Sequence, residues 1–353
     1  MSDKTNPGNF FEDFRVGQEI RHATPRTVGE GDAAVYMALY GSRFALPSAA
    51  SFAQSLGFRR APVDELLAFH IVFGKTVPDI SLNAIANLGY ASCVFGAPVY
   101  AGDTLATTST VIGLRENSNR QSGVVHVRSV GQNQRGEVVL DYVRWVMVRK
   151  RDPDAPAPPG EAPALPAAVA VEDLHVPEEL LLDSYDDALA GSRHRFADYA
   201  AGERIDHVDG TTIEEPEHAL ATRLYQNTAK VHFNQHSESK GRFGRRLIYG
   251  GHVISIARAL SFNGLANAFR IAAINGGSHV APCFAGDTIY AWSEALDAQI
   301  VPSRDDPGAL RLRKYGPCRE DAIRCSAPIS LAGSPRRAAA PGAAPPAACF
   351  VPT

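Results

Sequence analysis

The sequence predicts an α+β protein built from two related halves, each an antiparallel sheet curved around one long apolar helix. The first evidence is a repeat: FEDFRVGQEI at residues 11–20 returns as FADYAAGERI at residues 196–205, a shift of 185 residues. The second is PVYAGDTL from Pro98, which returns as PCFAGDTI from Pro282, a shift of 184 residues. Two matches at nearly one spacing indicate an internal duplication.

The same elements are predicted in the same order in both halves. A first helix is predicted at residues 29–41 and again at 214–227, and a longer, strongly apolar helix follows at 63–77 and at 250–265. The pattern then changes to alternation: residues 123–150 contain two runs of period-two apolar spacing around the turn-forming NQRG, which predicts a hairpin. A long apolar helix followed by antiparallel strands is typical of an α+β arrangement.

A segment rich in proline and alanine separates the halves, and its prolines favour extended backbone, as in a linker. We therefore predict an N-terminal domain over 1–152, a linker over 153–184, a C-terminal domain over 185–315 and an atypical tail over 316–353. The repeat predicts a strand near 323–335, but the sequence there lacks alternation and the end has a disordered composition. We therefore expect the terminal strand to be missing. A change of reading frame in the coding DNA is our hypothesis for its loss.

Composition argues against several classes of function. Thirty-five Lys and Arg against 38 Asp and Glu give a net charge of −3, so no nucleic-acid partner is expected. No apolar run approaches the ~18 to 20 residues that a membrane-spanning helix needs, and the N-terminus lacks the core of a secretory signal, so we expect a cytoplasmic protein without a membrane partner. The five cysteines include no CxxC pair and no histidine at zinc spacing, so no metal site is predicted.

The repeated units resemble tandem (double) hot-dog domains of the MaoC-like dehydratase and (R)-specific enoyl-CoA hydratase superfamily, whose motif runs approximately G-D-x-N-P-x-H before a glycine-bearing helix start. More narrowly, the likeness to the mesaconyl-CoA hydratase family runs from residue 7 to about residue 315 and is carried by FFEDFRVGQEIRHATPRTV, HIVFGKTVPDISLNAIANLGYA, LYQNTAKVHFN and LIYGGHVISIARALSFNGLANA. It implies a hydro-lyase that reversibly hydrates mesaconyl-CoA (2-methylfumaryl-CoA) to β-methylmalyl-CoA in acetyl-CoA or glyoxylate assimilation of the ethylmalonyl-CoA pathway type, without metal or redox cofactor.

The resemblance places His232 on the motif histidine and Asn227 on the position of its aspartate. In the first half the same positions hold Ser42 and Pro47, which implies a catalytically degenerate domain. An imidazole with a pKa of about 6.5 can activate water and then return the proton to the α-carbon, which is the role predicted for His232. A carboxamide cannot accept a proton at neutral pH, so Asn227 would orient water or the thioester. A polar loop histidine and a capping asparagine remain the alternatives.

Gly250 and Gly251 open the long helix of the second half. Free backbone N–H groups and the positive end of the helix dipole favour a developing thioester oxyanion there, and the absent side chains would let the thioester approach. A tight turn that needs glycine is the other interpretation. At the equivalent helix start of the first half, Asp64 and Glu65 are a reserve source of the missing acid, or ordinary stabilisation of a helix N-terminus.

The implied substrate carries a free carboxylate, so a cation should select it, ideally an arginine that binds both oxygens. The candidates beside the motif are Arg223, Lys230, Arg246 and Arg258, each of which could equally be solvated surface charge. His279 is similarly ambiguous between a site residue and a structural histidine. The duplicated AGDT is expected to be a turn of the fold, with Asp103 and Asp287 bonded to local backbone.

Four functions stay open on the sequence. Beside the mesaconyl-CoA hydratase, they are a broader (R)-specific enoyl-CoA hydratase, a hot-dog acyl-CoA thioesterase and a non-catalytic acyl-CoA-binding protein. The mesaconyl-CoA hydratase would need a carboxylate on its substrate, whereas the broader hydratase would not. A thioesterase would release free CoA thiol, and a binding protein would bind the CoA ester without a change of absorbance. A homodimer is what family analogy implies.

Overall fold

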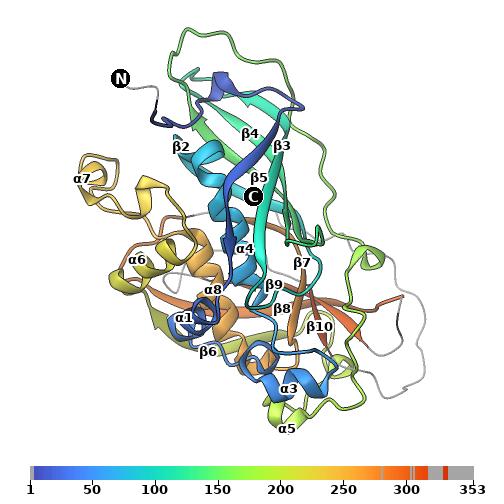
Figure 1. Ribbon diagram of the computed structural model, residues 1–353. Coiled ribbons are helices and arrows are strands. Elements are labelled where there is room, and N and C mark those ends of the chain that lie inside the picture. Colours follow the sequence, from blue (N-terminus) through green and yellow to red (C-terminus); the bar gives the residue numbers. More distant parts are fainter. Residues whose placement is uncertain (1–3, 280, 303, 305–306, 317–328, 333–353) are drawn as a thin grey trace.

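In the computed structural model, which describes residues 4–279, 281–302, 304, 307–316 and 329–332, the two halves repeat one order of elements (Figure 1). The first half contains β1 (Glu19–Thr27), α1 (Glu30–Tyr40), α2 (Ala45–Ser48), α3 (Ala50–Ser55), α4 (Glu65–Thr76), β2 (Ala84–Phe95), β3 (Thr104–Glu116), β4 (Ser122–Gln132) and β5 (Val138–Arg149). The second contains α5 (Asp187–Ala190), β6 (Arg204–Thr212), α6 (Glu215–Leu224), α7 (Gln235–Glu238), α8 (Gly250–Leu260), α9 (Phe262–Leu265), β7 (Arg270–Ser278), β8 (Thr288–Ile300), β9 (Gly308–Tyr315) and β10 (Ile329–Ala332).

The helices and the hairpin predicted from the sequence are confirmed. The helices α1, α4, α6 and α8 lie within the expected stretches, and β4 pairs antiparallel with β5 across the NQRG turn. The AGDT motif is indeed a turn: a carboxylate oxygen of Asp103 accepts the backbone N–H of Tyr100 at 2.9 Å, and Asp287 accepts that of Phe284 at 2.9 Å. The glycine before each aspartate has a positive φ, which explains why the motif needs it.

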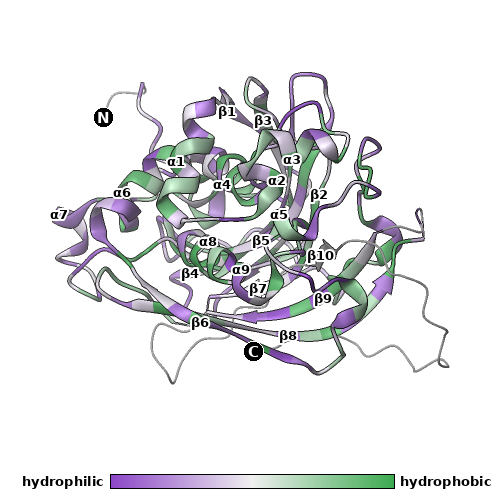
Figure 2. Ribbon diagram, turned by 90° about the horizontal axis from the view of Figure 1, so that it is seen from below, coloured by the Kyte–Doolittle hydropathy of each residue, from purple (hydrophilic) through white to green (hydrophobic). Residues whose placement is uncertain are grey.

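The strands form one antiparallel sheet in the order β1-β3-β4-β5-β2-β7-β10-β9-β8-β6. Each half contributes five neighbouring strands, and the pairing of β2 with β7 joins them, with Tyr90 opposite Gly277 and Cys93 opposite Ile274. Figure 2 shows β6, β8 and β9 curving beneath the helices. The sheet therefore wraps around α4 in one half and α8 in the other, as the sequence predicted.

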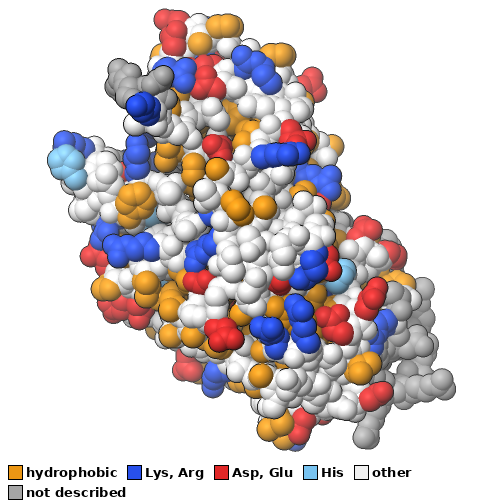
Figure 3. Space-filling model, viewed as in Figure 1, with side chains coloured by type: hydrophobic (Ala, Val, Ile, Leu, Met, Phe, Trp, Pro, Cys, Tyr) orange, Lys and Arg blue, Asp and Glu red, His pale blue; other side chains and the backbone are white. Residues whose placement is uncertain are grey.

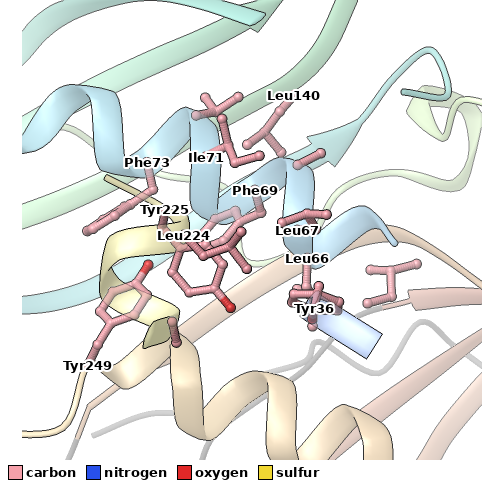
Figure 4. Close-up of a cluster of buried hydrophobic side chains, with 14 of the residues drawn as sticks. Tyr36, Leu66, Leu67, Phe69, Ile71, Phe73, Leu140, Leu224, Tyr225 and Tyr249 are labelled. Atoms are coloured by element: carbon pink, nitrogen blue, oxygen red, sulfur yellow. The ribbon is translucent and has the colours of Figure 1, made fainter. Parts of the chain in front are cut away.

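Helix α4 is buried along its whole length from Leu66 to Thr76. A helix that is apolar all round must be covered on every side, and here the sheet of the first half covers one side while the second half covers the other. Figure 4 shows Phe69 and Phe73 of α4 packed with Tyr225 and Tyr249 of the second half. The two halves thus share one hydrophobic core.

The predicted linker packs along the protein as an extended strap, which Figure 1 shows running from the end of β5 toward α5. Leu174, Leu180 and Leu182 are buried, and the backbone N–H of Leu181 donates to the carbonyl oxygen of Leu56 at 2.9 Å. Its prolines account for the extended path, whereas its leucines bind it to the core.

A strand is present where we expected none. Strand β10 pairs antiparallel with β7, Ile329 opposite Ala273, and with β9, Ile329 opposite Arg311. It occupies the position that β5 has in the first half, with four residues against twelve. The expectation of a missing strand was therefore wrong for residues 329–332, because pairing with two neighbours supports a strand without alternation. The rest of the predicted tail beyond residue 316 lies outside the described residues.

Charges of both signs are mixed over the face shown in Figure 3. This distribution agrees with the nearly balanced composition, and it forms no single-sign stripe of the kind that follows a phosphate backbone on that face. Within the described ranges, no helix combines the length and the hydropathy that crossing a bilayer requires.

The junction between the halves can be tested at Gly74 of α4. A Cβ added there would lie 1.9 Å from the carbonyl oxygen of Tyr225. We expect Gly74→Ala to lower the free energy of unfolding by about 3 kcal/mol, because the two backbones would have to separate. The control is Gly31→Ala in α1, where an added Cβ meets no atom within 4 Å and alanine favours the helix. Thermal melting measures both, and equal melting temperatures would contradict the packing argument.

Candidate active site

His232 ends a single turn of 3-10 helix, Lys230–His232, between α6 and α8. Its Nδ1 lies 3.0 Å from the carbonyl oxygen of Leu247, which can only accept, so Nδ1 carries the proton. Nε2 is then left with a free lone pair. Burial lowers the pKa of His232 to about 4, so the imidazole is neutral at pH 7 and can act as a base.

Asn227 lies five positions before His232, directly after α6, and is buried. Its Oδ1 accepts the backbone N–H of Ala229 at 3.1 Å, which fixes the orientation of the amide. Its Nδ2 is buried and has no hydrogen-bond partner among the described residues. A buried donor without a partner costs free energy, so this amide is well placed to donate to a bound molecule or water.

Both residues line one cavity of about 730 Å³ between the halves. Gly250, at the start of α8, and His279, just after β7, line it from the second half. The opposite wall belongs to the first half, including Phe73 of α4, residues 82–88 and Arg144 of β5. The fold therefore places a neutral imidazole, a free amide donor and a helix N-terminus around one cavity.

Comparison with known proteins identifies the family of this chain. The family model for mesaconyl-CoA hydratase matches residues 1–322. The chain belongs to the mesaconyl-CoA hydratase family. A β-methylmalyl-CoA dehydratase from Chloroflexus aurantiacus is 67% identical over 324 residues, covering 91% of this chain and 92% of that protein. A mesaconyl-CoA hydratase from Cereibacter sphaeroides is 63% identical over 312 residues, covering 88% and 89%.

Solved structures show the fold. The crystal structure of a MaoC domain protein dehydratase from Chloroflexus aurantiacus superposes with a TM-score of 0.92 at 62% identity, covering 95% of this chain and all of that one. A Mycobacterium tuberculosis protein with a double hot-dog fold superposes with a TM-score of 0.72 at 24% identity, covering 93% and 98%. This hydratase-family chain therefore has the double hot-dog fold that the sequence predicted.

The two glycines at the start of α8 are required by packing against aromatic rings. A Cβ at Gly250 would lie 2.1 Å from Cε1 of His279, and one at Gly251 would lie 2.5 Å from Cε1 of His70. The space expected to admit a thioester is thus filled by imidazoles. Gly250 borders the cavity, but Gly251 is not among the residues that line it. The N–H groups at the start of a helix have no partner one turn earlier, although that of His252 donates to the carbonyl oxygen of Tyr249 at 2.9 Å.

The structure separates the other candidates from this cavity. Oδ1 of Asp64 accepts the backbone N–H of Leu66 at 2.9 Å and so caps α4, and its charge balances that of buried Arg258. Glu65 forms an ion pair with Arg270, whose Nε lies 3.3 Å from Oε1. None of Asp64, Glu65 or Arg258 lines the cavity, so the geometry gives no support to a reserve acid or to Arg258 as the carboxylate cation.

The remaining cations lie at the surface. Arg223 and Arg246 line a second cavity of about 640 Å³, which also touches Asn227, and Arg246 is paired with Glu215. Lys230 is exposed and belongs to the main cavity, at whose rim the exposed Arg149, Lys240 and Arg242 also lie.

The sequence did not single out Arg144, and it left His279 undecided. Arg144 did carry a readable signal, because it stands between Tyr142 and Val146 in the inward alternation of β5. His279 carried none, since only the tertiary structure brings the end of β7 to the start of α8.

Buried histidines make the fold sensitive to acid. Burial lowers the pKa of His70 to about 3, of His218 to about 2, and of His232, His252 and His279 to about 4. The unfolded chain, with histidine pKa values of about 6.5, takes up protons at higher pH than the folded chain. We therefore expect the free energy of unfolding to be highest above about pH 6.5 and to fall steadily toward pH 4.

Urea denaturation between about pH 7.5 and 4.5 measures this dependence. Asp64 and Glu65 act in the opposite direction, because burial raises the pKa of each carboxyl group, that of Glu65 to about 7. They are outnumbered, because His207, whose pKa burial lowers to about 4, adds to the five histidines named above. His70→Gln should reduce the slope, whereas His236→Gln in the exposed helix α7 should preserve it. A stability that stays constant over this range would contradict the prediction.

Proposed function

We propose that this protein catalyses the reversible hydration of mesaconyl-CoA (2-methylfumaryl-CoA) to β-methylmalyl-CoA. The observation that supports it is the neutral His232 with its free Nε2, facing the same cavity as the N-terminus of α8. The names of the two relatives at 67% and 63% identity supply the substrate.

The proposed reaction begins with water in the cavity. Nε2 of His232 takes a proton from the water as its oxygen attacks the β-carbon of the enoyl thioester. We place the negative charge that develops on the thioester oxygen near the N-terminus of α8, where Gly250 borders the cavity although His279 occupies the space beside its Cα. The imidazolium then delivers its proton to the α-carbon, so that one water has been added and His232 is neutral again.

Asn227 completes this proposal as a positioning group. Its buried Nδ2 can donate to the attacking water or to the product hydroxyl, while Nε2 of His232 accepts from the same oxygen. Because an amide cannot accept a proton, His232 would carry out both proton transfers by itself. The low pKa favours the second transfer, because the imidazolium gives up its proton readily, while it makes the imidazole a weaker base in the first.

The CoA part of the substrate fits the cationic rim of the cavity. Lys230, Lys240, Arg242 and Arg149 are exposed there. Phosphates bind well to clustered lysine and arginine side chains at a solvated rim. Residues 237–243, on and after the projecting helix α7 in Figure 1, supply part of this wall. The acyl end would then point inward to His232.

The function is tested by following the enoyl-thioester absorbance of mesaconyl-CoA. We expect its loss without release of free CoA thiol, and a fall in kcat of about 1,000-fold in His232→Ala, the scale of a general acid–base contribution. Equal turnover of crotonyl-CoA would favour a broader enoyl-CoA hydratase. Release of free CoA thiol would favour a thioesterase. Binding of mesaconyl-CoA without turnover by folded protein would favour a binding protein.

The role of Asn227 is tested through the pH dependence of kcat. In the wild type we expect kcat to stay level down to about pH 5 and to fall near pH 4, as His232 becomes protonated. In Asn227→Asp a carboxylate near the imidazole favours its charged form, so the acidic limb should move to higher pH. Asn227→Ala, which adds no charge, is the control and should lower kcat without moving the limb. An unmoved limb in Asn227→Asp would contradict this placement of the amide.

A further inference from the structure

Arg144 of β5 is fully buried, with 0% of its surface exposed. Its Nη2 donates to the hydroxyl oxygens of Thr76 at 2.7 Å and Ser81 at 3.3 Å, and Nη1 lies 3.5 Å from Oδ1 of Asn87. The guanidinium also stacks 4.4 Å from the ring centre of Phe73. All of these partners are neutral, and the buried Nε has none among the described residues.

Two other buried arginines of this protein lie near carboxylates. Arg270 forms an ion pair with Glu65, and the charge of Asp64 raises the pKa of Arg258, whose Nη2 donates to the carbonyl oxygen of Ala268 at 2.7 Å. Within the described ranges, no carboxylate forms an ion pair with Arg144, although an uncompensated buried cation is costly. Buried Lys314 also contacts only a hydroxyl, that of Ser261, but an amine can lose its proton whereas a guanidinium cannot. A bound anion would therefore stabilise the buried positive charge of Arg144.

The position of Arg144 indicates where that anion comes from. It lines the same 730 Å³ cavity as His232 and Asn227. A continuous wall of rings connects it to the base: Phe73 lies under the guanidinium, the ring centres of Phe73 and Tyr249 are 5.5 Å apart, and those of Tyr249 and His232 are 5.5 Å apart. A molecule that occupies the candidate active site can therefore bring an anionic group to Arg144.

We propose that Arg144 binds the free carboxylate of the acyl group and so selects a dicarboxylic acyl thioester over a simple enoyl thioester. The inference rests on the proposed function and deepens it. A carboxylate can accept hydrogen bonds from two N–H groups of a guanidinium at once, including the unpartnered Nε. The Nδ2 of Asn87, also buried and without a described partner, offers a third donor beside it.

This contact also bears on the chemistry. In 2-methylfumaryl-CoA the carboxylate is attached to the β-carbon, which is the atom that water attacks. Holding the carboxylate therefore fixes the β-carbon relative to Nε2 of His232, which favours reaction by orientation. The half of the chain without the motif histidine would thus recognise the acyl group, while the other half carries out the proton transfers.

The test compares mesaconyl-CoA with 2-methylcrotonyl-CoA, in which a methyl group replaces the carboxylate. We expect Arg144→Met to lower kcat/KM for mesaconyl-CoA by about 100-fold or more, the scale of losing one partner of a buried charge pair, and to leave 2-methylcrotonyl-CoA unchanged or improved. Arg144→Lys keeps the charge but loses the planar fork, so a smaller loss confined to mesaconyl-CoA is expected. Arg149→Met, on the same strand at the exposed rim, should affect both substrates equally.

The outcomes separate this inference from the proposed function. If Arg144→Met and Arg144→Lys lower kcat/KM equally for both substrates and also lower the melting temperature, Arg144 has a structural role and the inference is overturned. The proposed function would stand in that case, provided that the wild type hydrates mesaconyl-CoA. A wild type without turnover would overturn the proposed function instead. The role of Arg144 can then still be tested by calorimetric binding to the His232→Ala variant. Tighter binding of mesaconyl-CoA than of 2-methylcrotonyl-CoA, with this preference abolished in the double variant His232→Ala, Arg144→Met, would support the inference. Equal binding of both esters to His232→Ala would overturn it.

Discussion

A network of buried hydrogen bonds between the two central helices holds the rest of this structure in place. The hydroxyl of Ser255 on α8 meets Nε2 of His70 on α4 at 2.8 Å and accepts the hydroxyl proton of Tyr36 at 2.9 Å. The hydroxyl of Tyr40 lies 2.7 Å from that of Tyr225 and 2.8 Å from Nδ1 of His252. Because buried polar groups are costly when unpaired, such a network tolerates little change in the distance between the halves. The same hydrogen bonds therefore limit changes in the width of the cavity between the halves.

The same burial sets the chemical state of the site. Removing histidines from water favours their neutral forms, which keeps His232 ready to accept a proton at pH 7. That arrangement costs stability in acid, because folded imidazoles cannot readily take up protons. The hydrogen bond from Nδ1 to Leu247 then decides which nitrogen is free. Base strength, tautomer and position thus follow from the packing of one turn against the following loop.

Duplication gives the cavity two unlike walls. The motif resemblance puts Ser42 and Pro47 of the first half at the positions of Asn227 and His232, and neither side chain can accept a proton at neutral pH. Strand β5 and helix α4 of that half contribute Arg144 and Phe73 to the cavity wall. The division of roles that we propose, proton transfer in one half and recognition of the carboxylate in the other, rests on this difference between the walls.

The sequence by itself determined the elements and their order. Apolar periods of 3.6 and 2 residues and the AGDT turns are local patterns, and with the 185-residue repeat they predicted the four main helices, the hairpin and the turns correctly. They failed at β10, where pairing with two neighbours forms a strand without alternation. The motif resemblance also drew attention to His232 and Asn227, whose roles remain proposals. Only the tertiary structure decided which buried cation lines the cavity. It placed Arg258 over the ring of Phe44 and away from the cavity, filled the space beside Gly250 with His279 and brought Arg144 to the wall. Contacts between segments so distant in the chain depend on how the halves pack, and no local pattern records them.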